Sequence, residues 1–275
     1  MKSSKLLRRI RVGLHHRFGV LSYKRSAPDV ANWLQTPLGA AFLAEQRECL
    51  ERHLQDLFGY HLVQMSIAPE LDLTPGSRIS HKINVAPHRE GKHLEGGVAL
   101  SPLISSYQSL PLPSESVDLV ILHHLLDYSQ APHQLLREVS RVLIPRGHLV
   151  IVGFNPWSGF GVMRQVARLF TRRPLWRHQS LRRGRLIDWL QLVDLQPIAA
   201  ERGFYRPPIR HQGVLERLHW VERWGKKLQC PGGGFYTIVA CKEVAAAIPM
   251  KPAWDDRPEP VPGLGINPLR RDRND

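Results

Sequence analysis

The alternation of apolar and polar stretches is sharpest between residues 109 and 156, where the chain reads SLPLPSESVDLVILHHLLDYSQAPHQLLREVSRVLIPRGHLVIVGFNP. Residues 118–124 and 148–154 are continuous apolar runs rich in β-branched residues, a pattern typical of strands covered on both faces. Between them, residues 132–144 carry apolar positions at helical spacing. Because so short a crossover requires two parallel strands in one sheet, the segment predicts a strand–helix–strand unit of an open α/β fold.

The remaining pattern extends this sheet. Helical spacing of apolar positions predicts helices at 38–58, 161–170 and 183–193, and short apolar runs predict strands at 60–67, 77–87, 98–110, 196–205 and 233–243. The last two strands have no ordinary crossover helix between them, which favours an antiparallel edge. We therefore expect a mostly parallel sheet with an antiparallel edge strand and helices on both faces.

The ends of the chain differ in composition from its middle. Residues 1–30 are predicted to be a flexible basic arm, residues 33–243 a single domain, and the Pro-rich residues 245–275 a disordered tail. No apolar run approaches the roughly 20 residues of a membrane span. Cys49, Cys230 and Cys241 are too few and too scattered to predict a disulfide framework or a zinc site. These features predict a cytoplasmic protein with no metal.

The positive charge is concentrated in two places. The net charge is +14, yet residues 1–25 and 157–187 each hold eight basic residues and no acid, so the rest of the chain is slightly acidic. Local positive charge attracts polyanions such as nucleic acid, which makes a polyanion a candidate partner. A solvated arm and a solvated helix face would give the same pattern. The chain has no H-E-x-x-H, Walker or G-x-S-x-G motif, which excludes the hydrolases and NTPases that those motifs mark.

Ligands of open α/β sheets bind beyond the carboxyl ends of the strands. His123 and His124 end one predicted strand, and Asn155 and Trp157 follow the next. Because neighbouring residues of a strand point to opposite faces, we expect at most one of the two histidines to line a pocket and the other to lie in the core.

The segment 109–156 also carries a resemblance. A Leu-Pro turn, an apolar strand that contains an aspartate, a short linker, a helix that ends Arg-Val-Leu-Ile-Pro-Arg-Gly, and a second apolar strand follow one another. In this order the segment resembles class I S-adenosylmethionine-dependent methyltransferases of the type 11 group. A looser resemblance covers residues 33–243. Over this range, which includes the preceding helix and the sequences GYHLVQ and GFNP, the chain is similar to YafS-type proteins.

The resemblance implies a Rossmann-like class I methyltransferase fold, S-adenosyl-L-methionine as the cofactor, and methyl transfer to an unknown acceptor nucleophile. Carried onto the strand ends, it implies that the cofactor is bound by Ser66, Ala68, Val85, Ala86, Ser106, Ser109, Leu110, His123 and His124. No catalytic residue is assigned, because in-line methyl transfer needs mainly positioning of its reactants.

Three departures from the family pattern leave an alternative open. The loop after the first strand, SIAPELDLTPGS, has only Gly76 where the family has a Gly-rich turn. Ala86 stands near the position of the acid that holds the ribose, and Ser106 stands where an acid faces the adenine amine. The alternative is a catalytically degenerate protein on the same scaffold that acts as a binding module, for example for nucleic acid through its basic stretches.

Overall fold

The computed structural model describes residues 21–87, 101–171, 173–179, 181–206 and 231–243, and all statements below concern these residues. The chain separates into a unit of residues 1–244 and a unit of residues 245–275. The predicted disordered tail belongs to the second unit and lies outside the described residues.

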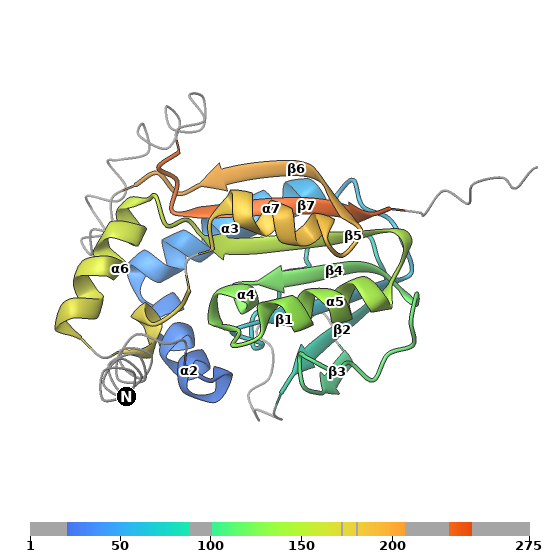
Figure 1. Ribbon diagram of the computed structural model, residues 1–275, viewed down its shortest axis with the longest axis horizontal. Coiled ribbons are helices and arrows are strands. Elements are labelled where there is room, and N and C mark those ends of the chain that lie inside the picture. Colours follow the sequence, from blue (N-terminus) through green and yellow to red (C-terminus); the bar gives the residue numbers. More distant parts are fainter. Residues whose placement is uncertain (1–20, 88–100, 172, 180, 207–230, 244–275) are drawn as a thin grey trace, which may run out of the picture. The chain divides into compact units, whose positions relative to one another are not determined.

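Seven strands form one sheet in the order β3-β2-β1-β4-β5-β7-β6 (Figure 1). They are β1 (His61–Ser66), β2 (His81–Ala86), β3 (Ser101–Ile104), β4 (Val117–His123), β5 (Leu143–Phe154), β6 (Leu195–Gly203) and β7 (Phe235–Lys242). Strands β3, β2, β1, β4 and β5 pair in parallel. Strand β7 pairs antiparallel with both β5 and β6, so the antiparallel pairing falls at one edge of the sheet. The predicted fold class is confirmed.

Helices cover both faces of this sheet (Figure 1). They are α2 (Tyr23–Leu34), α3 (Pro37–Leu54), α4 (Leu125–Tyr128), α5 (Pro132–Val142), α6 (Gly159–Phe170) and α7 (Arg183–Gln191), with a 3₁₀ turn η1 (Pro174–Trp176). One core cluster joins α2 and α3 to Leu119 and Ile121 of β4, and the other joins α5 and α7 to Val120 and Leu122. The central strand is therefore apolar on both sides, as its continuous run of apolar residues predicts.

The predicted strand–helix–strand unit is β4–α5–β5. Val120 lies opposite Leu149 in the parallel register. Leu135, Val139 and Val142 of α5 are fully buried. Pro132 begins the helix at a position where a missing N–H leaves no hydrogen bond unmade.

The N-terminal boundary differs from the prediction. Helix α2 begins at Tyr23, and its Ala27 and Val30 are buried in the core. The predicted basic arm, residues 1–30, therefore extends too far toward the C-terminus, because residues from Tyr23 onward are helical. The sequence did not indicate this helix, since its two buried apolar residues are surrounded by basic and polar residues. Residues 1–20 lie outside the described residues.

The connection between β1 and β2, residues 67–80, contains no helix. Side chains of the two strands hold it instead. Gln64 Nε2 donates to the carbonyl of Leu71 (2.6 Å) while Gln64 Oε1 accepts from the amide of Leu73 (2.9 Å). Asn84 Nδ2 donates to the carbonyl of Pro69 (2.6 Å). The loop's polar backbone groups are thus satisfied by side chains of the sheet.

Candidate functional site

The carboxyl ends of β1 and β4 meet at Ser66 and His123, which are paired in register. Ser66 Oγ lies 2.9 Å from His123 Nδ1 and accepts from the amide of Ala68 at 3.1 Å. The hydroxyl of Tyr107 donates to the Ser66 carbonyl at 2.8 Å. Protein groups therefore occupy the hydrogen-bonding positions at the end of β1.

His124 follows β4 in the left-handed region of backbone space, with φ 52° and ψ 5°. This conformation is uncommon for a non-glycine residue. Because the backbone at His124 is not extended, side chains no longer alternate between the two faces of the sheet at this residue. The two imidazole rings therefore lie near one another, with centroids 4.6 Å apart. The expectation that His123 and His124 point to opposite faces is wrong, because it assumed an extended backbone through His124. Both side chains are buried.

Gln46 of α3 joins the two histidines. Its Nε2 lies 2.7 Å from His124 Nε2, and its Oε1 lies 3.1 Å from His123 Nε2. A single set of protons satisfies these contacts: His123 donates from Nε2 and accepts from Ser66 at Nδ1, while His124 accepts at Nε2 and donates from Nδ1. Burial lowers the pKa of His123 well below its ordinary value and that of His124 to about 3. Both rings are therefore neutral near pH 7.

Asp127 completes this buried cluster. Its Oδ2 accepts from His124 Nδ1 (3.1 Å) and from the amide of Phe154 (3.0 Å), which ties α4 to the end of β5. Its Oδ1 is buried and has no hydrogen-bond partner. Burial raises the pKa of Asp127 well above its ordinary value. The Phe154 ring stacks on His124 at 4.0 Å, so the polar cluster is covered by an aromatic ring.

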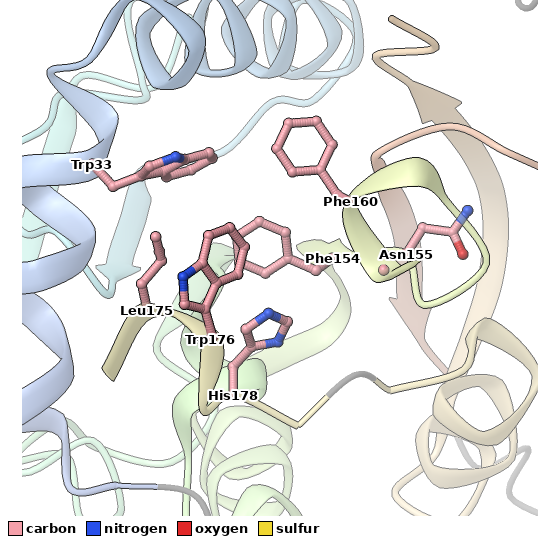
Figure 2. A pocket seen from close by; sticks show the side chains of 8 residues that line it. Trp33, Phe154, Asn155, Phe160, Leu175, Trp176 and His178 are labelled. Carbon is pink, nitrogen blue, oxygen red and sulfur yellow. The ribbon is translucent and has the colours of Figure 1, made fainter. Parts of the chain in front are cut away.

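An aromatic pocket is lined in part by Phe154, and Figure 2 shows rings from separate parts of the chain around it. We call it the aromatic pocket; its lining residues are Trp33, Phe154, Asn155, Phe160, Gly161, Leu175, Trp176 and His178. Its volume is about 10 Å³, enough for one water-sized group. His178 stacks on Phe154 at 4.6 Å. Burial lowers the pKa of His178 well below its ordinary value.

A larger cavity of about 460 Å³ adjoins the aromatic pocket and shares Trp33, Leu175 and Trp176 with it. Polar groups of Asp29 and Arg173 belong to its lining. The two spaces lie between α2, η1 and α6, near the carboxyl end of β5.

The structure brings most of the sequence-predicted site residues to one edge of the sheet. Ser66, Ala68, Val85, Leu110, His123 and His124 are buried, Ala86 is half-buried, and Ser106 and Ser109 are exposed. The amide of Ser105 donates to the Ala86 carbonyl at 3.0 Å, which places Ser106 beside the end of β2. None of the nine residues lines either cavity described above.

Sequence reasoning missed Gln46, Asp127 and the ring of Trp33. Gln46 lies on a helix far from the strand ends, and nothing in its neighbourhood marks it as a partner of two histidines. Asp127 could have been found, because an acid three residues after a histidine can reach the same ring once a helical turn follows.

Comparison with known proteins identifies the family. A family model described as "Methyltransferase domain" matches residues 58–151. A solved SAM-dependent methyltransferase from Thermotoga maritima has the same fold, with a TM-score of 0.58, 15% identity, and coverage of 77% of this chain and 93% of that one. The methyltransferase solved with the Trm112 activator of Haloferax volcanii gives a TM-score of 0.51 at 13% identity, covering 72% and 88%.

The chain therefore belongs to the class I S-adenosylmethionine-dependent methyltransferase family. Within that family it is grouped with the uncharacterized protein YafS of Escherichia coli (strain K12), to which it is 33% identical over 198 residues, 70% of this chain and 75% of that protein. The resemblance stated from the sequence is confirmed. Among the described helices, none combines the length and the apolar character needed to cross a membrane.

The residues present fit the family's cofactor only in part. No helix follows β1, so the helix N-terminus that could bind an anionic group there is missing. No carboxylate stands at Ala86, where β2 ends. What remains for a ligand among the described residues at this edge is the exposed turn at Ser106 and Ser109.

Proposed function

We propose that this protein is an S-adenosylmethionine-dependent methyltransferase that binds its cofactor weakly at the carboxyl edge of β1, β2 and β4. The observation that carries the proposal is membership of the methyltransferase family together with an unaltered β4–α5–β5 half of the fold. The exposed turn at Ser106 and Ser109 would face the adenine. Polar groups of this turn would take the place of the missing acid and Gly-rich loop, because the backbone at Ser66 and Ala86 is already hydrogen-bonded within the protein.

The same proposal gives the aromatic pocket a role on the acceptor side. Its lining is almost wholly aromatic or aliphatic, and it lies against Phe154, whose ring also stacks on His124. A methyl-sized group of an apolar acceptor would gain contact with Trp33 and Trp176 there, and a ring would occupy the adjoining cavity of about 460 Å³, which the same two tryptophans line. The three buried histidines are neutral and poor proton acceptors, so the acceptor would need a nucleophile that is already unprotonated near pH 7.

Calorimetric titration of the full chain with S-adenosylmethionine and with S-adenosylhomocysteine tests the cofactor part. We expect measurable but weak binding, because each missing charged partner typically costs about 1.5–3 kcal/mol. Ser106→Trp should weaken binding by blocking the edge. Ser80→Trp is the matched control, because Ser80 is an exposed serine just before the amino end of β2, at the opposite edge of the sheet. The absence of heat and of a thermal shift with both ligands would contradict the proposal.

A second candidate is a binding module that has lost methyl transfer. The observation that favours it is the β1–β2 connection, where Gln64 and Asn84 hold a helix-free loop and protein groups satisfy the end of β1. In that case the basic stretches would carry the function, through polyanion binding that falls steeply with salt. Failure of cofactor binding combined with salt-dependent RNA or DNA binding would select this candidate.

A further inference from the structure

Outside the carboxyl edge, a thiol, an imidazole and a carboxylate converge between α3 and β6. Cys49 and His53 lie four residues apart on α3, and Glu201 lies on β6. Their potential ligand atoms all fall within 4.8 Å of one another. Residues four apart on a helix share a face, which is why two of the three side chains point to the same strand.

The distances suit a tetrahedral metal ion. Cys49 Sγ lies 3.4 Å from Glu201 Oε2, and His53 Nε2 lies 3.4 Å from the same oxygen. With ordinary zinc–ligand bond lengths, the edges of a tetrahedron would be about 3.6 Å between sulfur and oxygen and about 3.4 Å between nitrogen and oxygen. Two of the three edges therefore match a zinc site, and the third, between the Cys49 sulfur and His53 Nε2, is no longer than 4.8 Å, so side-chain rotations that shorten it would admit the ion.

The surroundings of the three groups also favour an ion. Arg52 Nη2 binds Glu201 Oε1 at 2.6 Å, which orients the carboxylate and leaves Oε2 toward the thiol and the imidazole. Metal-binding carboxylates are commonly held by such an outer hydrogen bond. His53 Nε2 is shielded from solvent and makes no hydrogen bond of good geometry. Thr237, opposite Glu201 on β7, lies with its Oγ1 3.4 Å from the Cys49 sulfur and closes the far side.

We propose that Cys49, His53 and Glu201 form a Zn²⁺ site that clamps α3 to β6, with a water molecule in the fourth position. Sulfur, nitrogen and oxygen ligands together suit zinc better than magnesium or calcium, which prefer oxygen alone. Binding converts the Cys49 thiol to a thiolate and releases its proton to solvent. The sequence hides this site because its ligands come from segments far apart in the chain.

Cobalt substitution tests the proposal on the full chain. The protein is stripped with a chelator and titrated with Co²⁺, and we expect one equivalent to bind with a sulfur-to-cobalt charge-transfer band and intense tetrahedral d–d bands. Zn²⁺ should displace Co²⁺, abolish both signals and raise the melting temperature. Cys49→Ser should remove the charge-transfer band, and Glu201→Gln should weaken Zn²⁺ binding at least about tenfold.

Two further variants guard against misfolding and nonspecific binding. His53→Gln changes a partly exposed side chain, so it should fold normally and still lose tight Zn²⁺ binding. Cys241→Ser is the matched control, because the Cys241 thiol donates to the backbone carbonyls of Arg146 and Lys242 and does not belong to the three-residue cluster, so the cobalt spectrum should stay unchanged. Equal Zn²⁺ affinity in the parent and in His53→Gln, or a parent without a charge-transfer band, would overturn the proposal.

Discussion

Replacing Gln46 with leucine tests whether the cluster beneath the carboxyl edge is a closed hydrogen-bond network. The amide of Gln46 is fully buried and contacts one nitrogen of His123 and one of His124. Leucine has a similar size but no polar atom, so the substitution leaves both nitrogens buried and without a partner. An unsatisfied buried polar group costs about 1–3 kcal/mol, so we expect the free energy of unfolding to fall by about 2–6 kcal/mol.

Urea unfolding followed by circular dichroism measures this loss. With a urea dependence of about 2 kcal/mol per molar, the midpoint should fall by about 1–3 M. Gln55→Leu is the matched control: it makes the same change at an exposed position just after the same helix, and it should shift stability by less than about 0.5 kcal/mol. If Gln46→Leu unfolds at the same urea concentration as the parent, then water reaches the histidines and the cluster is not sealed.

Four further outcomes are expected. Burial lowers the pKa of His124 to about 3, so between about pH 6.5 and 3 the unfolded chain binds more protons than the folded protein. The free energy of unfolding should therefore fall by about 2 kcal/mol from pH 7 to pH 5 because of this ring alone. Urea unfolding at each pH measures this change. Asp127 acts with the opposite sign because burial raises its pKa, so Asp127→Asn should make the acid destabilisation steeper in the same urea series, and an unchanged pH dependence would contradict this. Leu135→Ala should lower the free energy of unfolding by about 2–5 kcal/mol, and an unchanged melting temperature would show that the α5 face is not packed as described. If the basic stretches bind polyanions, affinity for a DNA or RNA oligomer should fall steeply between 50 and 200 mM salt in a filter-binding assay, whereas weak, salt-independent binding would favour a purely solvated role.

The fold was largely readable from the chain, because the neighbouring central strands β4 and β5 each carry a continuous apolar run. The run at 118–124 and the helical spacing of Leu135 and Val139 were enough to predict β4, α5 and their parallel partner. Boundaries were less accurate: the helix predicted to reach residue 58 ends at Leu54, since apolar residues continue past the helix into the turn.

The site was harder to predict, for a local and a long-range reason. Locally, the left-handed backbone at His124 cannot be read from an apolar run, yet it decides that both rings lie together. At long range, Gln46 approaches the histidines from a helix 77 and 78 residues earlier, and no spacing rule connects them. The assignment of the nine cofactor-binding residues stays a prediction.

The placement of β7 has a consequence for how the chain is made. The last described strand of the domain enters the sheet between β5 and β6, and it also supplies the surface against which α3 packs, through Phe42 with Phe235 and Cys49 with Thr237. Cys49 and Thr237 are 188 residues apart, so at ~5–20 residues per second a ribosome needs roughly 10–40 s between them. During that interval the part of α3 around Phe42 and Cys49 lacks its β7 partners, and β5 has an unpaired edge. Nascent chains that stop before Phe235 should therefore depend on chaperones and aggregate when released, whereas those that extend past Lys242 should not.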